Sequence, residues 1–379
     1  MSHPNALEVQ LYDRAFTRLG WLNDFTSLSV TWRHNRRGMA TIAVPADHLR
    51  AAQLVEPGRR VVVAYTPEGG QVQTFSGRVG TVQAQGPRSS ASLVVTVLGD
   101  WVERALAWPV PGAALSAQTA AYWTASGPAE TVVKQLLTAN AVTRLGRPLT
   151  VAPDLARGAT VNVSARMVPL SDVIEPAADL GGIGLRMVQP MGGTTIGVDV
   201  TVGADRTARV LSEDTGAVTS WSLTANAPNA TRAVVGLQGE GTDRVFLSVV
   251  DAPAEVDWDL GEMFVDADDL AGTATTEGAQ RGADKLTEQA ATISVSATLA
   301  ESDVWRFGRN VFLGDLVTVE PIPGLRRVER VREARLTFTA GDGLVVEPVI
   351  GDPDKTEPER AMAAQVARLA AAVRLLRTR

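Results

Sequence analysis

Apolar and polar residues alternate in short stretches through the first hundred residues. Leu7, Val9 and Leu11 lie on one side of the first stretch, and residues 27–32 and 39–44 alternate in the same way. A period of two predicts β-strands. Further stretches at 60–65, 71–79 and 92–98 continue the pattern, with Gly- and Pro-rich turn signals between them. Regularly spaced short strands favour a closed barrel or a sandwich, and residues 47–54 predict one short helix.

A different pattern begins after Trp101. Pro128 opens a segment in which apolar residues recur at helical spacing, and a second helix is expected from Ser171 to Gly181-Gly182, although Pro176 lies inside it. Between and after these helices the sequence predicts short strands. Residues 106–215 therefore read as a small α+β region, with an apolar helical stripe at Val132, Val133, Leu136 and Leu137.

The strand pattern returns over residues 216–352, with a helical insertion near 276–290. The predicted fold class is mainly β with an α+β middle region. The expected division is a β-barrel-like domain at 1–105, the α+β domain at 106–215, a second β-barrel-like domain at 216–352 and a C-terminal amphipathic helix at 353–379.

The C-terminal segment carries an apolar seam. Its residues are spaced 4, 3, 4 and 3 apart, which is the heptad spacing of a coiled coil, over about two heptads. The seam could bind copies of itself, bind a partner or fold back on its own chain. It is the candidate oligomer or partner interface, formed by Met362, Val366, Leu369, Val373 and Leu376.

Composition narrows the possible functions. The 379-residue chain is 45% hydrophobic, carries a formal net charge of −6 and contains no cysteine. The absence of thiols removes disulfides and Cys-based metal sites, and the acidic balance disfavours a dedicated nucleic-acid binder. No apolar stretch is long enough to span a bilayer, and the first residues lack the pattern of a signal peptide, so no membrane anchor is expected.

Candidate chemistry is sparse. His3, His34 and His48 have no metal-ligand spacing, and no GxSxG sequence is present. His3 is expected in a frayed terminus, and the other two histidines are expected at the surface. Residues 236–241 (GLQGEG) resemble a phosphate loop but lack its ending, so a turn between strands is the better interpretation. The sequence therefore predicts no catalytic residues, no cofactor, no metal site and no enzymatic activity.

Two clusters of charge have alternative interpretations. The acidic residues are expected in a solvated loop, with a cation site or a glycosidase carboxylate pair as alternatives. The basic residues are expected at solvated strand ends or in salt bridges, with contact to passing DNA as the alternative. The acidic cluster is Asp251, Glu255, Asp257, Asp259, Glu262, Asp266, Asp268 and Asp269; the basic groups are Arg33, Arg36 and Arg37, and Arg326, Arg327, Arg330, Arg332 and Arg335.

Several short sequence motifs, which we call phrases, occur together in a recognisable order. They are LYDR at 11–14, LGWLNDF at 19–25, PADH at 45–48, QRG at 280–282 and LGD at 313–315. In this order and spacing they resemble the Gp37-like minor tail proteins of siphophages that infect actinobacteria. The phrases bracket residues 7–352, whereas residues 105–215 match only in outline.

The resemblance implies a structural virion protein. It implies a hub at the distal end of the phage tail, in which three copies form a ring that adapts a sixfold tail tube to threefold tip proteins and encloses the DNA channel. The implied partners are the distal tail protein, the tape measure protein and the tip or central fibre proteins, with DNA passing without specific binding. Assembly would take place in the host cytoplasm. The alternatives are a receptor- or carbohydrate-binding tail module and a tail-associated cell-wall hydrolase.

Overall fold

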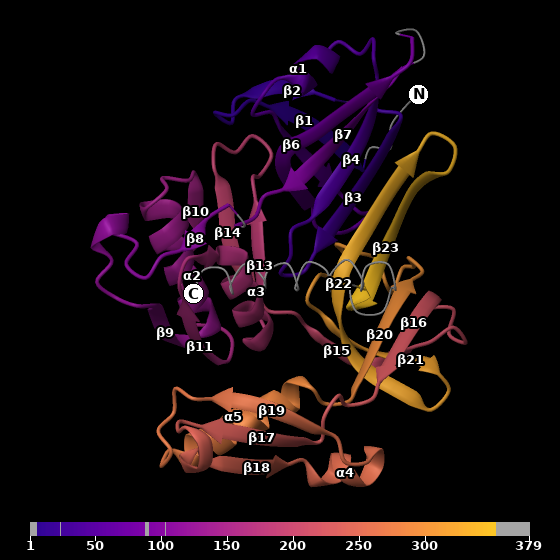
Figure 1. Cartoon of the computed structure of the whole chain (residues 1–379). Helices are drawn as coiled ribbons and strands as arrows, with labels where there is room; N and C mark the ends of the chain where they lie inside the picture. Colours follow the sequence, from indigo (N-terminus) through magenta and orange to yellow (C-terminus); the bar gives the residue numbers. More distant parts are fainter. Residues whose placement is uncertain (1–5, 23, 88–90, 103, 354–379) are drawn as a thin grey trace. The chain divides into compact units, whose positions relative to one another are not determined.

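The computed structural model describes residues 6–22, 24–87, 91–102 and 104–353 (Figure 1). Contacts divide the chain into unit 1, Met1–Trp221 and Ala297–Gly351, and unit 2, Ser222–Ser296 and Asp352–Arg379. The chain enters unit 2 within strand β16 (Val218–Asn226) and leaves it within β20 (Thr292–Leu299). These two strands are hydrogen-bonded neighbours. The four-part division at residues 105, 215 and 352 remains a prediction from the sequence.

Unit 1 is dominated by a 13-stranded sheet that also includes β16 and β20. The strand order runs β16-β20-β23-β22-β3-β4-β7-β6-β5-β1-β2, and β21 pairs with both β22 and β15. The prediction of a mainly β chain is confirmed. The order is open at both ends, so a barrel is not confirmed. The bounds are β1 Leu7–Tyr12, β2 Arg18–Trp21, β3 Ser27–Arg33, β4 Met39–Pro45, β5 Arg60–Tyr65, β6 Gln73–Gln85, β7 Ser92–Gly99, β15 Asp205–Leu211, β21 Leu316–Ile322, β22 Leu325–Thr339 and β23 Gly343–Gly351.

Strand β3 lies between a strand from the N-terminal part of the chain and a strand from the C-terminal part. It pairs antiparallel with β4 on one side and with β22 on the other, so that Val30 lies opposite both Ala40 and Leu336. The alternation seen in the sequence places Leu28, Val30 and Trp32 in the core. A shift of one residue would turn this apolar set to the other face, so burial excludes such a shift.

The middle of unit 1 is the α+β region that the sequence predicts. The apolar stripe of α2 (Ala129–Leu137) is buried as expected. Helix α3 (Leu170–Leu180) runs through Pro176 and is followed by Gly181 and Gly182, and the φ of +68° at Gly182 is typical of a helix end. The remaining elements are β8 Leu106–Ala107, η1 Leu115–Ala117, β9 Trp123–Pro128, the π-helical η2 Thr138–Thr143, β10 Leu149–Val151, β11 Thr160–Ala165, β12 Val168–Pro169, β13 Gly184–Val188 and β14 Ile196–Thr201, with α1 at Ala51–Val55 nearer the N-terminus.

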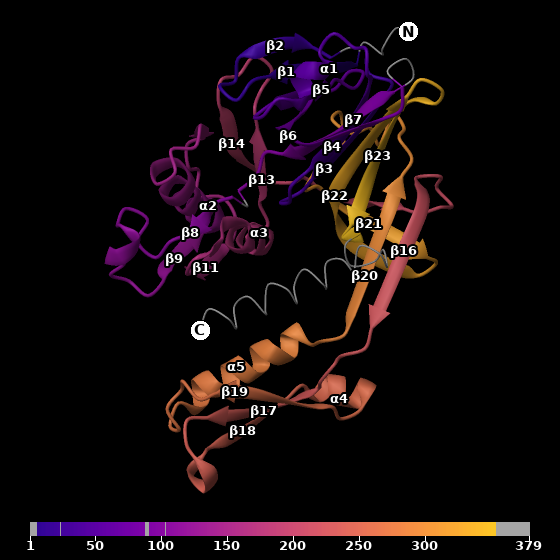
Figure 2. The same cartoon turned by 45° about the horizontal axis from the view of Figure 1, so that its top comes forward.

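Unit 2 contains a three-stranded sheet with one helix on it. The strands lie in the order β18 (Phe246–Val250), β17 (Arg232–Leu237) and β19 (Glu262–Ala267), and α5 (Thr275–Glu288) packs along them (Figure 2). The GLQGEG segment begins at the end of β17 and runs into the connection to β18, where it ends at the first residue of the short η3 (Gly241–Asp243), which confirms the turn interpretation.

The acidic segment 251–269 is not the loop that the sequence predicts. Its first part forms α4 (Ala252–Trp258), because Asp251 accepts a hydrogen bond from the backbone N–H of Ala254 and Pro253 occupies the first turn. Its second part is β19, where Val265 and Ala267 alternate with exposed residues and face the core of unit 2.

Two glycines let α5 approach the sheet closely. A Cβ built on Gly282 would lie 2.8 Å from Cγ2 of both Val235 and Val249, and one on Gly278 would lie 2.7 Å from Cδ2 of Leu237. The Gly282 of the QRG phrase is therefore explained by helix–sheet packing. Within the described part of the chain, no helix combines the length and apolar character needed to cross a membrane.

Replacing Gly282 by Val tests this packing. The added side chain collides with two β-branched residues that have little rotamer freedom, so the free energy of unfolding of unit 2 should fall by about 1–3 kcal/mol. Hydrogen exchange of residues 232–250 against denaturant would report it. Thr276→Val places the same side chain at an exposed position of the same helix, and an equal loss there would contradict the argument.

Candidate functional site

The turn after β3, residues 34–38, connects three parts of unit 1. Asn35 sits in the left-handed region with φ of 51°, where Asn is among the few tolerated side chains. Its Nδ2 donates to Oδ1 of Asp179 and to the carbonyl of Ile183, each at 2.8 Å, and its Oδ1 accepts from the N–H of Leu185 at 2.7 Å. One buried amide thus fixes the end of β3 to the end of α3 and the start of β13.

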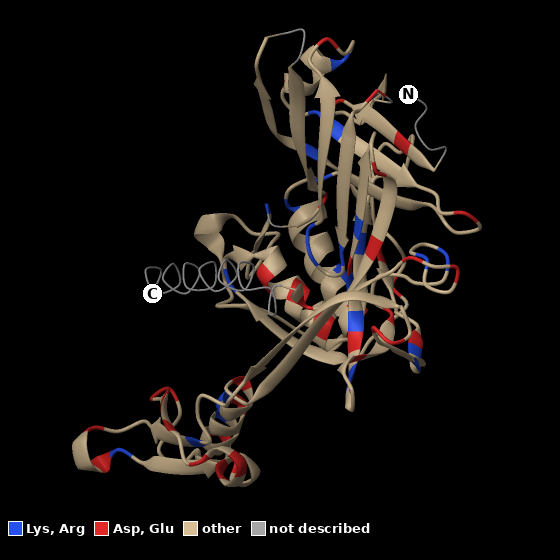
Figure 3. Cartoon of the chain, turned by 90° about the vertical axis from the view of Figure 1, so that its right-hand side faces the viewer, with Lys and Arg blue, Asp and Glu red and all other residues tan. Residues whose placement is uncertain are grey.

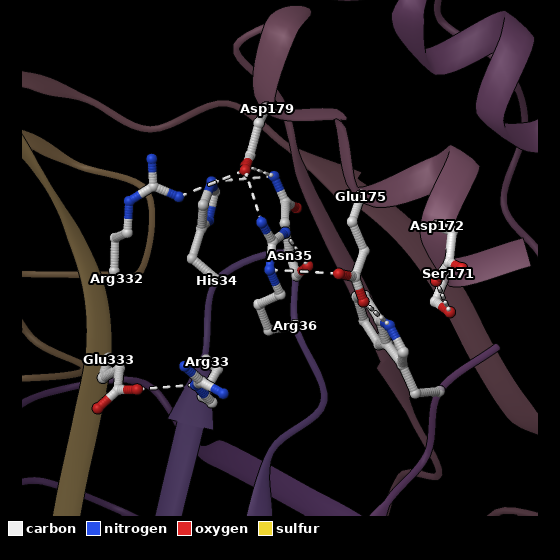
Figure 4. A network of polar contacts seen from close by, with 11 residues as sticks. Arg33, His34, Asn35, Arg36, Ser171, Asp172, Glu175, Asp179, Arg332 and Glu333 are labelled. Atoms are coloured by element: carbon white, nitrogen blue, oxygen red, sulfur yellow. Dashed lines mark hydrogen bonds and ion pairs between the residues drawn. The ribbon is translucent and has the colours of Figure 1, made fainter. Parts of the chain in front are cut away.

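Asp179 is the centre of a charged cluster (Figure 4). Its Oδ2 lies 3.2 Å from Nη2 of Arg36, on the turn, and 3.5 Å from Nη1 of Arg332, on β22. The neighbouring Glu175 accepts from Nε of Arg36 at 3.2 Å and from Nε1 of Trp101 at 2.7 Å. The cluster therefore links α3 to the turn after β3 and to strand β22.

The two carboxyl groups of α3 respond differently to this setting. Burial acts to raise the pKa of Asp179, but hydrogen bonding from Asn35 and the charges of Arg332 and Arg36 outweigh it and lower that pKa. Burial dominates at Glu175 and raises its pKa despite Arg36 and Trp101. A second pair, Arg33 Nε to Glu333 Oε1 at 2.7 Å, closes the junction between β3 and β22.

His34 is buried, contrary to the expected surface position, because it lies between the backbones of Gly184 and Gly314. A Cβ on either glycine would come within 2.9 Å of the imidazole Cε1. Burial is the main reason that the pKa of His34 is lowered from 6.5 to about 3, and the charges of Arg330, Arg332 and Arg36 add to it, while Asp179 acts in the opposite direction. The imidazole is therefore neutral at pH 7.

A cavity of about 500 Å³ adjoins this cluster. It is lined by residues that include Trp32, His34, Asp100, Arg186 and Phe307. Among the described residues, Nε1 of Trp32 has no hydrogen-bond partner. The carboxylate of Asp100 accepts from Arg60 and, at 2.6 Å, from the hydroxyl of Ser76. With a pKa of about 3, the imidazole of His34 is a weak base, and the carboxylate of Asp100 is already engaged in hydrogen bonds.

The LGD phrase forms a second buried anchor. Asp315 accepts hydrogen bonds from the N–H of Ala204 at 2.8 Å, from Nε of Arg206 at 2.7 Å and from the N–H of Phe312 at 3.1 Å. Gly314 has a φ of +93°, and its carbonyl would lie 1.9 Å from a Cβ on Gly203. The phrase thus fixes the strand β21 beside β15.

The LYDR phrase also has a local structural explanation. Oδ1 of Asp13 accepts from the N–H groups of Ala15 and Thr17 at 2.8 Å, which shapes the turn between β1 and β2. The hydroxyl of Tyr12 accepts from the N–H of Gly192 at 2.7 Å. The phrase therefore ties the N-terminal sheet to the loop between β13 and β14.

The structure places some of the candidate residues from the sequence but not all of them. Met362, Val366, Leu369, Val373 and Leu376 lie outside the described residues, as does His3. The basic groups form internal contacts: Arg326 pairs with Glu320 at 2.9 Å, and Arg335 pairs with Glu333 at 3.0 Å. Over the described ranges, no group of acidic or histidine side chains is arranged to hold a metal ion.

Sequence reasoning missed Asp179, Glu175 and Asn35 as a connected set. One signal was available. Asp179 stands in the last turn of α3, which has no basic residue, and a carboxylate there opposes the helix dipole. An acid in this unfavourable position indicates a tertiary partner, although the sequence could not show that Arg36 and Arg332 provide it.

Comparison with known proteins gives consistent results. A family described as Siphovirus ReqiPepy6 Gp37-like protein matches residues 8–352. No curated protein matches the sequence. Similar folds include a tail protein from Neisseria meningitidis MC58 (TM-score 0.51, 12% identity, covering 94% of this chain and 99% of that one) and prophage tail protein gp18 from Listeria monocytogenes EGD-e (0.51, 11%, 96% and 99%). A 43 kDa tail protein of prophage MuSo2 from Shewanella oneidensis is also similar (0.53, 11%, 92% and 99%).

Replacing Asp179 by Asn tests the cluster. The variant leaves Arg36 and Arg332 without their shared counter-charge, so the free energy of unfolding should fall by about 2–4 kcal/mol. Because the pKa of Asp179 is lowered, its contribution is complete above the ordinary carboxyl pKa and is lost as the pH falls through the folded-state value. The difference in the free energy of unfolding between the variant and the unmodified protein should be largest at about pH 6 and should shrink below about pH 4. Asp172→Asn on the exposed side of α3 is the control, measured by urea denaturation.

The neutral His34 predicts a second pH dependence. The unfolded chain binds a proton near pH 6.5 that the folded chain excludes until about pH 3. The contribution of His34 to the free energy of unfolding is therefore complete above pH 6.5. It falls as the pH drops, by about 1–2 kcal/mol between pH 6.5 and 5. His34→Gln should flatten this slope in urea titrations. An unchanged slope would show that the imidazole is not the group responsible.

Proposed function

We propose, because this chain belongs to the Siphovirus ReqiPepy6 Gp37-like protein family, that it is the hub at the distal end of a siphophage tail. The observation that carries the proposal is the extent of the likeness. The family match spans residues 8–352, and the chain also shares its fold with tail proteins along 99% of their length. A partial match would leave room for an unrelated function.

The hub is a ring of three copies. Head-to-tail contacts between identical subunits close into rings, and a ring of three can join a sixfold tail tube to threefold tip proteins if each subunit presents two similar β-rich surfaces. The ring encloses the channel through which DNA leaves, without binding it specifically. The net charge of −6 supports weak contact with a polyanion.

The partners follow from this position. The distal tail protein and the tape measure protein contact the hub from the tail tube, and the tip or central fibre proteins contact it from the other side. The protein acts at the distal tail tip of the virion and is assembled in the host cytoplasm. Its role is structural and not enzymatic, and the pairing of Asp100, Asp179 and Asp315 in hydrogen bonds and ion pairs supports this role.

The mass of the purified protein in solution tests the ring. Light scattering at several concentrations should give three times the chain mass of 40.1 kDa. A second sample truncated after Asp352 asks whether the apolar seam 362–376 holds the copies together. Loss of the trimer on truncation would assign trimerisation to the seam, and its persistence would assign it to the β-rich part of the chain.

The position in the virion needs a separate measurement. Antibodies against the protein, imaged by electron microscopy, should label only the end of the tail opposite the head. Label along the tail tube or on the capsid would contradict the hub, even if the purified protein were a trimer.

A further inference from the structure

Charge is distributed unevenly along the chain. Residues 222–296 contain thirteen Asp and Glu but only four Lys and Arg, a formal charge of −9, whereas the whole chain carries −6. The red segments of the ribbon in Figure 3, which mark Asp and Glu, are frequent in this part of the chain. A stretch of 75 residues with this charge attracts positively charged surfaces, and the attraction is strongest at low salt.

The same unit exposes one face of its sheet. Helix α5 covers the side that carries Val235, Leu237 and Val265. Side chains on the opposite side belong to alternate residues of each strand. This outer face carries Phe246 and Phe264, which are 55% and 54% exposed, together with Val250, which is 43% exposed. We call it the aromatic face, and it consists of Arg232, Val234, Gly236, Phe246, Ser248, Val250, Glu262, Phe264 and Asp266.

The arginines near the aromatic face are already paired. The guanidinium of Arg244 lies 5.7 Å from the ring centroid of Phe246 and 5.5 Å from that of Phe264, and it also bonds to Asp266. Arg232 forms an ion pair with Glu255 at 2.9 Å. The face therefore presents two ordered aromatic rings within an acidic surround, without unneutralised positive charge of its own.

We propose that the C-terminal segment of the same chain, residues 360–379, docks on the aromatic face. This segment lies outside the described residues. It contains five arginines and no acidic residue, a formal side-chain charge of +5. On the helix that the sequence predicts, Met362, Val366, Leu369, Val373 and Leu376 form the apolar seam, and Arg368 and Arg377 flank it on either side.

The chemistry of the two surfaces is complementary. The apolar seam covers the exposed phenylalanine rings, and the flanking arginines meet the carboxylates of the acidic unit. Burying two rings that are half exposed gives a favourable apolar contact, and Arg side chains also stack on aromatic faces.

The dimensions also agree. Three strands at about 4.8 Å spacing make a face about one helix wide, since a helix with its side chains is about 10–12 Å across. On the other face, the fourteen-residue α5 covers the same three strands. Strands of five or six residues are about 17–20 Å long, so about twelve residues of a helix that rises about 1.5 Å per residue can lie over them. The docked segment would complete a three-layer arrangement with helices on both faces of the sheet.

Hydrogen–deuterium exchange of the full-length protein tests this inference, which does not depend on the proposed hub function. At low protein concentration, amides of residues 360–379 should exchange roughly tenfold or more slowly than in the isolated peptide. In the Phe246→Ser, Phe264→Ser variant this protection should be lost. Leu115→Ser with Leu155→Ser, which changes two exposed leucines in unit 1, is the matched control and should retain it.

A reciprocal variant removes the dependence on the folding of unit 2. Val366→Asp with Leu369→Asp alters only the segment, and it should increase exchange in residues 246–250. Protection of residues 360–379 that is unaffected by Phe246→Ser, Phe264→Ser would overturn the inference. So would exchange at the rate of the isolated peptide.

Light scattering on the same samples separates an intramolecular contact from one between copies. Protection that persists on dilution, and in samples whose measured mass is that of one chain, supports docking within the chain. Protection that disappears on dilution in parallel with an oligomer would assign the segment to a second copy and overturn the proposal. A trimer whose segment remains unprotected would leave the hub function intact and contradict only this inference.

Discussion

The antiparallel pairing of β3 with β22 is the constraint on which unit 1 depends. It places residues 27–33 beside residues 333–339, so segments from opposite ends of the sequence share one sheet and one core. Such a pairing forms only after a very long loop has closed, and the entropy of that closure must be offset by contacts made at the junction. The cluster around Asp179 and the pair between Arg33 and Glu333 supply those contacts at the end of the shared strand.

The charged junction does more than add stability. A partly buried carboxylate without its partners is costly, so Asp179 favours arrangements that bring Arg36, Arg332 and Asn35 to it together. Apolar packing alone would accept several registers of β3 against β22 if the buried face were preserved. The polar contacts therefore select one geometry for the N-terminal sheet, α3 and the C-terminal strands, which a subunit of a multi-protein assembly needs if its surfaces are to meet partners reproducibly.

Local pattern identified many of the elements but not the elements that they pair with. The alternation at Leu28, Val30 and Trp32 gave a strand, and the stripe from Val132 to Leu137 gave a helix, because burial on one face leaves a period in the sequence. Nothing local indicates that β3 pairs with β22, since the register depends on residues three hundred positions away. The acidic segment misled for a related reason: its charge suggested a loop, whereas Asp251 caps α4 and alternate residues of β19 are buried. The cluster around Asp179 could be inferred only in part, from an acid at the wrong end of a helix.

The connection to unit 2 has an evolutionary consequence. The chain enters residues 222–296 along β16 and returns along β20, and these two strands are hydrogen-bonded neighbours. The two ends of the inserted segment therefore lie side by side. Near them, Thr219 Oγ1 donates to the carbonyl of Thr298 at 3.2 Å. Segments whose two ends are adjacent can be lengthened, shortened or exchanged with little disturbance to the host fold. We therefore expect residues 222–296 to differ in length and sequence among related chains, while the large sheet that includes β16 and β20 stays the same.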